Sequence, residues 1–422
     1  MGLISSLGGM PGNVLPRRVL AVTAFLGTLA ALASCNDSNN TPQGGFPVPN
    51  SVAIADVNGD GLPDLLVATT LDQGNLSNPG YANVILNTQG AAGTFKTGVQ
   101  YPTVNVNPTS MAVADLTGSG QLDLVVATLS GSVSVYSHGS APGTFQAAVN
   151  YNTGGQPNQV VIADVNGDGH PDLVLADLSM QGSVIILLQD GSHPGTFVSS
   201  PMVLATQLST ASAQVADLNG DGLPDIVATG YDANGNNGQV LVFFQNAAQP
   251  GTFLAPVSFP AGPQPQSVKV ADMNGDGLPD LVVADVGPGA DGTGIGGVAI
   301  LLQDAAHPGS FLPGVGYATP GGAVDVAVGD LDGDGKPDVV VANLNPPPTG
   351  SVSVLLQDPA HPGALQSASS YPGFGEPIGV AIADLNNDGH PDIAVADGTS
   401  ATVLWAIPTT PGTFQTAVQV GE

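Results

Sequence analysis

The chain has 422 residues, of which 42% are hydrophobic and only 9% are charged, with 58 Gly and 36 Pro. A disordered acidic chain would carry fewer apolar residues, so the composition predicts a globular protein, and the short apolar runs between turns favour β-strands. The formal net charge is −29, and no arginine and only three lysines follow residue 35. Phosphates are bound by basic side chains, so we expect no nucleic acid partner.

The first 35 residues are typical of a targeting segment. Two arginines precede an apolar stretch over residues 19–33, which is too short for a comfortable transmembrane helix and suits a signal-peptide core. It ends in a lipobox-like sequence at Cys35, the single cysteine of the chain, so no internal disulfide is possible. We expect residues 1–35 to be a lipoprotein-type signal peptide and Cys35 to carry the lipid. An ordinary secretory signal cut nearby is the alternative.

The polar residues 36–45 are predicted to form a flexible tether, and residues 46–422 form the folded domain. This organisation predicts a protein of the cell envelope that is lipid-anchored to a membrane, on the periplasmic side or at the cell surface. The protein would instead be secreted if the signal is cut elsewhere.

An acidic loop, Asp-x-Asn-Gly-Asp-Gly-x-x-Asp or a near copy, recurs seven times between two apolar runs. The spacing between successive copies is 49 to 59 residues, which indicates one structural unit repeated seven times. The loops begin at Asp56, Asp115, Asp164, Asp217, Asp272, Asp330 and Asp384.

The third copy shows how one unit is built. A strand (QVVIAD) enters the loop at residues 164–172, a second strand (LVLAD) leaves it, and a third (GSVIILLQD) precedes a turn and a fourth strand from Thr196. The unbroken apolar runs predict strands buried on both faces. Four strands in a unit of this length match a propeller blade. We therefore predict an all-β, seven-bladed β-propeller of four-stranded blades with calcium-binding loops.

A Gly-Thr-Phe turn or a close variant precedes the fourth strand of each unit. Its large side chain is expected to pack between neighbouring blades rather than to stack on a ligand. The residues concerned are Phe95, Phe145, Phe197, Phe253, Phe311, Leu365 and Phe414.

The loop pattern predicts a hard cation. Positions 1, 3, 5 and 9 offer side-chain oxygens, position 7 offers its backbone carbonyl, and Gly at position 6 permits the positive φ that turns the chain around an ion. All-oxygen ligands suit Ca²⁺ better than Mg²⁺, and no sulfur or imidazole set favours zinc or copper. Position 12 is apolar (Val67, Leu175, Val283), unlike the Glu of an EF-hand.

Six loops carry the full pattern. Their predicted calcium ligands are Asp56, Asn58, Asp60, Leu62, Asp64, Asp164, Asn166, Asp168, His170, Asp172, Asp217, Asn219, Asp221, Leu223, Asp225, Asp272, Asn274, Asp276, Leu278, Asp280, Asp330, Asp332, Asp334, Lys336, Asp338, Asp384, Asn386, Asp388, His390 and Asp392. At position 7 only the carbonyl would bind, and the side chains of His170, Lys336 and His390 are expected to point to solvent.

The copies are not equal. The loop at Asp330 has four acidic ligands and should bind calcium most tightly, whereas the loop at Asp115 has Thr117 and Ser119 at positions 3 and 5 and should be weak or empty. At a tenfold excess of calcium over Kd, each site adds roughly 1.4 kcal/mol, so six sites would add ~8 kcal/mol. That is the whole stability of an ordinary domain, which predicts a structural ion.

The segments ADVNGDGLPDLLVA, ADLNGDGLPDIVA and ADMNGDGLPDLVVA, each followed by PGTF or a relative, resemble FG-GAP/VCBS repeats, the units of the integrin-α-type propeller. The resemblance covers about residues 50–420. It implies a seven-bladed propeller with calcium in the loop that joins the first two strands of a blade. Bacterial relatives are commonly secreted or lipid-anchored and act in binding, in adhesion or as accessory domains of larger enzymes.

In a four-stranded meander, successive turns alternate between two faces. The connections between second and third strands and between blades should therefore share one face, opposite the calcium loops, and we call this the loop-rich face. The long connections 71–82, 231–239, 286–297 and 343–350 fall on it, near Tyr101, Tyr151, Phe259, Tyr317 and Tyr371. Variable loops on a rigid scaffold commonly bind ligands. The alternative is that the insertions are neutral and the aromatics pack between blades.

We therefore expect a membrane-anchored, extracytoplasmic binding or adhesion module that recognises a glycan or a protein. One alternative is a polysaccharide lyase or hydrolase using the central funnel, and another is a purely structural envelope or assembly protein. Against an enzyme, the loops use most carboxylates and no nucleophile elbow or acid/base pair is visible. An accessible pocket with a carboxylate outside the loops, near a Tyr or Lys, would favour the enzyme.

Overall fold

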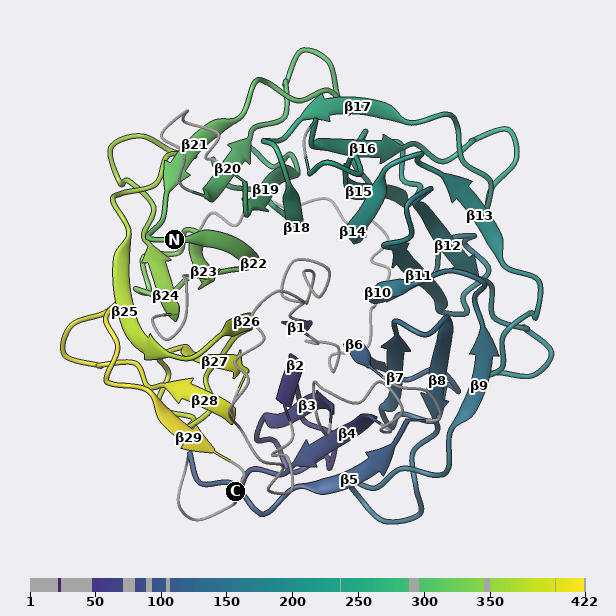
Figure 1. Ribbon diagram of the computed structural model, residues 1–422, viewed down its shortest axis with the longest axis horizontal. Helices are drawn as coiled ribbons and strands as arrows, with labels where there is room; N and C mark the ends of the chain where they lie inside the picture. The colour runs from purple at the N-terminus through teal and green to yellow at the C-terminus, as the bar shows by residue number, and fades with distance from the viewer. Residues whose placement is uncertain are drawn as a thin grey trace, which may run out of the picture.

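Seven antiparallel sheets stand in a ring in the computed structural model, and each is a meander of strands that are consecutive in the chain (Figure 1). The first sheet has in addition the two-residue strand β1 (Val22–Thr23), which pairs with β2. The predicted seven-bladed, all-β propeller is confirmed. The structure describes residues 22–23, 48–70, 80–88, 93–103, 107–235, 237–287, 296–344, 350–398 and 400–420.

Within each blade the strands run in chain order from the centre of the ring to its perimeter (Figure 1). The innermost strands are β2 (Val48–Ala55), β6 (Pro108–Ala114), β10 (Pro157–Ala163), β14 (Ser209–Ala216), β18 (Pro265–Ala271), β22 (Gly322–Gly329) and β26 (Pro377–Ala383). The second strands are β3 (Asp64–Thr70), β7 (Asp123–Thr128), β11 (Asp172–Asp177), β15 (Asp225–Tyr231), β19 (Asp280–Asp285), β23 (Asp338–Leu344) and β27 (Asp392–Asp397).

The two outer strands of each blade follow the same order. The third strands are β4 (Gly80–Ile85), β8 (Ser132–Tyr136), β12 (Ser183–Leu187), β16 (Gln239–Phe243), β20 (Gly297–Leu301), β24 (Gly350–Leu355) and β28 (Ser400–Leu404). The outermost strands are β5 (Val99–Pro102), β9 (Val149–Asn152), β13 (Met202–Ala205), β17 (Val257–Pro260), β21 (Val315–Ala318), β25 (Ser369–Phe374) and β29 (Val418–Val420).

The core lies between blades. Every residue of the second strand β11 is buried, as predicted from its apolar run. Its side chains pack both ways: Leu173 belongs to an apolar cluster with Val125 of blade two, and Val174 to a cluster with Ile226 of blade four. Each blade is therefore held by its two neighbours, as flat sheets with two apolar faces require.

Aromatic side chains join the outer parts of neighbouring blades. The rings of Tyr151 and Phe197 meet edge to face at 5.4 Å, and the Phe197 N–H donates to the Tyr151 hydroxyl (3.3 Å). The same edge-to-face ring contact recurs in the pairs Tyr101–Phe145, Phe259–Phe311 and Tyr371–Phe414, and Tyr317 packs in one cluster with Leu365. The predicted inter-blade role of the turn Phe is confirmed. The aromatics expected near the rim of the loop-rich face pack between blades instead.

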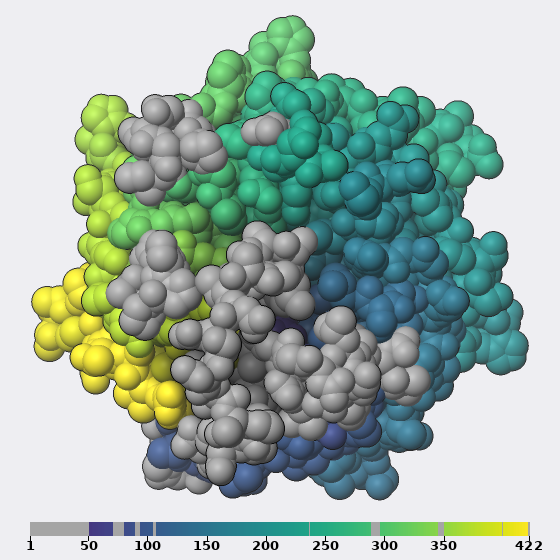
Figure 2. Space-filling model, viewed as in Figure 1, coloured from purple at the N-terminus to yellow at the C-terminus, as the bar shows by residue number. Residues whose placement is uncertain are grey.

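The ring closes by packing. All four strands of the last blade, β26–β29, follow one another in the chain, and none of the described strands is exchanged between the last and the first blade. Val52 and Leu65 pack in one cluster with Ala394 and Val403, and the Asn87 side chain donates from Nδ2 to the Leu385 carbonyl (2.7 Å). The last blade therefore lies directly beside the first. Figure 2 shows the other blades following one another around the molecule, from blue through teal and green to yellow.

The start of the fourth strand differs from the prediction. Phe197 forms only an isolated bridge with Gln189, and β13 begins at Met202 rather than at Thr196. The Phe197 side chain turns into the inter-blade core, and the residues after it are exposed up to Pro201, which has no N–H to pair.

Several predictions fall outside the described residues. They concern Cys35, the tether at residues 36–45, the leader apart from β1, and most of three long connections of the loop-rich face. Within the described part of the chain, no helix is long and apolar enough to cross a bilayer.

Candidate functional site

Each acidic loop wraps around its first carboxylate. In the first loop, Asp56 Oδ1 accepts hydrogen bonds from the N–H groups of Gly59 (2.6 Å) and Asp60 (3.1 Å), and Oδ2 accepts from Gly61 N–H (2.9 Å). Gly59 and Gly61 have φ of 74° and 90°, a region that side chains disfavour. The two glycines of the motif are thus explained by the turn itself.

The carboxylate at position 9 is fully buried. Asp64 is 0% exposed, and its two oxygens accept from the N–H groups of Val57 (3.0 Å) and Asn87 (2.8 Å). Burial raises the pKa of Asp64 to about 7, although the backbone donors oppose this, and the nearby carboxylates of Asp60 and Asp56 add to it. Burial likewise raises the pKa of Asp392 to about 7, that of Asp172, Asp225 and Asp338 to about 6, and that of Asp280.

Positions 3 and 5 bond to each other. In the third loop, the Asn166 side chain donates to Asp168 Oδ2 (3.0 Å), and Asp168 Oδ1 accepts from His170 N–H (2.8 Å). Among the described residues, three acidic side chains gather closely enough to share one ion only in the sixth loop. There, one ligand oxygen each from Asp330, Asp332 and Asp338 lies within 4.8 Å of the others.

One position-7 side chain departs from the prediction. Lys336 was expected to point to solvent, but its Nζ lies 3.3 Å from Asp334 Oδ2, and 35% of the side chain remains exposed. The lysine folds back because the acidic loop offers it a counter-charge two residues away.

The second loop keeps the same backbone turn although it lacks the side-chain ligands at positions 3 and 5. Its Gly118 and Gly120 have φ of 72° and 82°, and Gly120 N–H donates to Asp115 Oδ2 (2.6 Å). Beside the position-9 carboxylate stands an imidazole: His138 Nδ1 is 2.9 Å from Asp123 Oδ1. The fold of the loop therefore does not depend on carboxylates at positions 3 and 5.

The loops also sit at the junction with the following blade. Position 2 of a loop offers its carbonyl to a side chain of the next blade, as in the bond from Gln245 Nε2 to the Val165 carbonyl (2.8 Å). Position 3 faces the next blade's Gly-Thr-Phe turn, where a Cβ on Gly143 would lie 3.1 Å from Asn58 Cβ. Glycine at that turn lets the acidic loop of one blade approach its neighbour.

A second recurrent carboxylate, at the end of the second strand of some blades, was not predicted from the sequence. Asp177, Asp285 and Asp397 end the second strands of blades three, five and seven, and each is buried. Each Oδ1 accepts the N–H of the residue before the proline that starts its blade: Gln156 (2.8 Å), Gln264 (2.8 Å) and Glu376 (2.7 Å). The sequence does contain a signal for this contact: each blade that has this Asp at the end of its second strand also has a Gln-Pro or Glu-Pro dipeptide at the start of its first strand.

The charged groups of the inner strands serve the fold. Asp325 in β22 is 0% exposed, and its oxygens accept from Ser267 Oγ (2.9 Å) and Val380 N–H (3.1 Å), so it joins three blades. Burial lowers the pKa of Lys269 in β18, while the Asp325 charge opposes this. Because Asp325 is inaccessible, this pair does not make the open carboxylate pocket that an enzyme would need.

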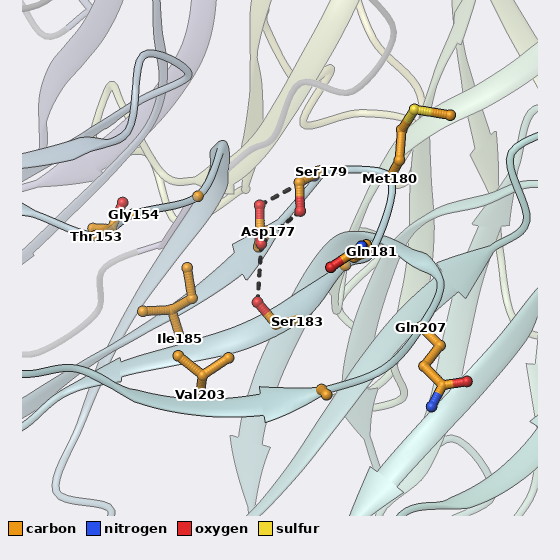
Figure 3. A pocket seen from close by; sticks show the side chains of 13 residues that line it. Thr153, Gly154, Asp177, Ser179, Met180, Gln181, Ser183, Ile185, Val203 and Gln207 are labelled. Atoms are coloured by element: carbon orange, nitrogen blue, oxygen red, sulfur yellow. Dashed lines mark hydrogen bonds between the residues drawn. The ribbon is translucent and has the colours of Figure 1, made fainter.

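A cavity of about 540 Å³ lies on the outer half of blade three (Figure 3). It is bounded by the connections β9–β10, β11–β12 and β13–β14, and by Ser183, Ile185, Val203 and Ala205 on one face of β12 and β13. In a meander, these three connections all belong to the loop-rich face. A concave site therefore exists on the face predicted to bind ligands.

Comparison with known families decides the relationship. The FG-GAP-like repeat matches residues 56–126, 115–175, 164–228, 217–283, 289–341 and 330–395, and five of these segments start at the first Asp of an acidic loop. The chain belongs to the FG-GAP-like repeat family. A comparison with curated protein sequences finds no match for it.

Solved structures share the fold of this FG-GAP-like repeat protein. The periplasmic gluconolactonase PpgL of Pseudomonas aeruginosa is similar with a TM-score of 0.54 and 20% identity, over 85% of this chain and 96% of that chain. BBS1N, solved in complex with ARL6DN, is similar with a TM-score of 0.50 and 13% identity, over 85% of this chain and 91% of that chain. At such identities the likeness concerns the fold alone.

Proposed function

We propose that this FG-GAP-like repeat protein is a calcium-stabilised binding module, anchored outside the cytoplasm through Cys35, that recognises a glycan or protein ligand with its loop-rich face. The observation that carries the binding role is the cavity of blade three, which opens among the connections of that face. The fold of the family is compatible with a binding or a structural module.

The acidic loops support the calcium component by their chemistry. Their donors are oxygens only, and one oxygen each of Asp330, Asp332 and Asp338 lies within 4.8 Å of the others. Burial and the neighbouring carboxylates raise the pKa of the position-9 carboxyls although backbone N–H groups oppose this, so the charged form is disfavoured there. A divalent cation would compensate that charge, and it would be held chiefly by the side chains at positions 1, 3, 5 and 9.

Bound calcium would act on the assembly of the ring. Position 2 and position 3 of a loop contact the next blade, as Val165 and Asn58 show. An ion that fixes the loop would therefore also fix the neighbouring blade. The ion would supply charge compensation and rigidity, and the residues of the loop-rich face would contact the ligand.

Calcium removal tests the first component. The full-length protein should lose several degrees of Tm when EDTA is added and regain them with calcium but not with an equal concentration of magnesium. Metal analysis after dialysis should find about six ions per chain. An unchanged Tm together with metal-free protein would contradict the proposal.

Paired surface variants test the binding face. Met180 is 80% exposed beside the cavity, and Leu254 is 51% exposed next to a Gly-Thr-Phe turn, on the opposite face. Met180→Lys should reduce binding to glycan arrays and to immobilised envelope proteins, and Leu254→Lys should not. If neither ligand class binds the parent protein, the purely structural role replaces this proposal.

A further inference from the structure

The cavity of blade three presents hydrogen-bond acceptors of an unusual kind (Figure 3). Asp177 Oδ2 accepts from the hydroxyls of Ser179 (2.8 Å) and Ser183 (2.9 Å). A serine hydroxyl has one proton, so both protons are committed to the carboxylate, and only oxygen lone pairs remain for a ligand. A molecule lying against these serines therefore has to donate hydrogen bonds.

The carboxylate itself is unavailable to a ligand. Its Oδ1 accepts from the N–H groups of Gln156 (2.8 Å) and Ser179 (3.0 Å), so Asp177 has four donors in all and fills its usual capacity. A cationic ligand would find no free carboxylate oxygen. An anionic ligand would meet the negative charge, and the described residues that line the cavity include no Lys, Arg or His to offset it. The electrostatics therefore disfavour an anionic ligand, and the four donors on Asp177 leave no oxygen for the direct ion pair that a cationic ligand would need.

The remaining lining suits a ligand with both polar and apolar faces. Ile185 and Val203 form an apolar wall, and Val203 is 56% exposed within it. The side-chain amides of Gln181 and Gln207 lie at the rim and are exposed. A volume of about 540 Å³ falls in the range of small-molecule sites. Neutral sugars combine donating hydroxyls with apolar C–H faces.

We propose that this cavity binds a neutral saccharide unit whose hydroxyls donate to Ser179 and Ser183. The inference rests on the proposed function, because it names the ligand class for a site on the loop-rich face. The Asp177 carboxylate is a positioning group: it orients the two serine hydroxyls and does not touch the sugar.

The test uses full-length protein in calcium buffer with four probes of similar size. Glucose, galactose and N-acetylglucosamine are neutral, and galacturonic acid is anionic. Saturation-transfer NMR and calorimetry should detect at least one neutral sugar and no binding of galacturonic acid. Detection of galacturonic acid alone, or of no sugar at about 10 mM, would overturn the inference.

A matched pair of variants checks the polarity argument. Asp177→Asn would place an amide NH2 where both serine protons now point, so the hydroxyls of Ser179 and Ser183 would turn from acceptors to donors toward a ligand, which should weaken sugar binding about tenfold or more. Asp397→Asn changes the equivalent carboxylate of blade seven, which accepts from Glu376 and Gly375 N–H, and should leave binding unchanged. Equal losses in both variants would contradict the inference. If hexoses fail while Met180→Lys still abolishes binding to a protein ligand, the proposed function stands and only the saccharide inference falls.

Discussion

At the residue scale, one large side chain per blade sets the contact between outer strands. Phe197 packs edge to face on Tyr151 and is 6% exposed, and Leu365 occupies the same place in blade six. The Leu365 position is evidence that an aliphatic side chain fits this interface. The contact thus depends first on filled volume and second on ring geometry.

Substitution of Phe197 should separate these two contributions. Phe197→Ala should lower the free energy of unfolding by about 3–5 kcal/mol, because it leaves a cavity between two blades. Phe197→Leu should cost only about 1 kcal/mol, the edge-to-face part of the contact. Urea unfolding measures both. Similar losses in the two variants would show that the ring, rather than the volume, holds the interface.

Residue-level prediction succeeded where a motif repeats and was less reliable elsewhere. The Phe anchors were predictable because six copies share the local motif Gly-Thr-Phe or Gly-Ser-Phe. The buried Asp285 was missed because its partner, the Gln264 N–H, is supplied by a connection whose shape the sequence does not reveal. The Lys336 side chain was placed wrongly because its ion pair with Asp334 depends on the curl of the loop.

At the scale of one element, the backbone turn of the acidic loop does not depend on the full set of predicted ligands. Positions 4 and 6 of the second loop have positive φ, as they do in the other loops, although Thr117 and Ser119 replace the ligands. Its Gly120 N–H donates to Asp115 Oδ2, and the position-6 N–H makes the equivalent bond in every other loop. The ligand positions should therefore be interchangeable between copies.

Restoring the missing oxygens should create a calcium site in the second loop. The variant Thr117→Asn, Ser119→Asp, His138→Gln supplies positions 3 and 5 and removes the imidazole beside Asp123. Calorimetry and metal analysis should find one calcium ion more per chain than in the parent protein. The reciprocal change Asp330→Asn should remove one ion from the sixth loop. An unchanged count in both variants would mean that these loops do not hold the metal.

At the scale of the whole molecule, the six position-9 carboxylates of the acidic loops whose pKa burial raises make stability depend on pH. They are Asp64, Asp172, Asp225, Asp280, Asp338 and Asp392. In calcium-free protein, the folded state keeps protons that the unfolded state releases. This stabilisation is complete below about pH 4 and is lost as the pH rises through 6 to 7.

The Tm of EDTA-treated protein should therefore fall between about pH 5 and pH 7.5. Saturating calcium should reverse the trend, because the ion binds the deprotonated loops and is displaced by protons in acid. Scanning fluorimetry in both buffers checks the two slopes. Identical slopes with and without calcium would contradict a metal in these loops.

The seam of the ring should behave like any other inter-blade contact. Asn87 reaches the Leu385 carbonyl across the seam (2.7 Å), as Gln303 reaches the Leu218 carbonyl within the ring (3.0 Å). Asn87→Ala and Gln303→Ala should each destabilise the protein by about 1–3 kcal/mol, because each leaves a buried carbonyl unpaired. Urea unfolding compares them. A much larger loss for Asn87→Ala would mark the seam as a special closure.

Repeat spacing predicted the number of blades and the strand order, but neither the closure of the ring nor the cavity. A periodic sequence fits a closed ring with or without an exchanged strand, and the difference lies in which apolar faces meet, as Val52 and Val403 do. The cavity of blade three depends on residues from Thr153 to Gln207, which lie before and after the whole blade in sequence and which only the fold brings together.

Because every blade is one unbroken stretch of chain, the architecture has a consequence for its history. Tandem duplication or loss of a single coding segment inserts or removes a whole structural unit without rewiring either end. The remaining blades would only have to change the angle between neighbouring sheets so that the ring closes again. Relatives of this chain with fewer or more repeats are therefore accessible in single genetic steps.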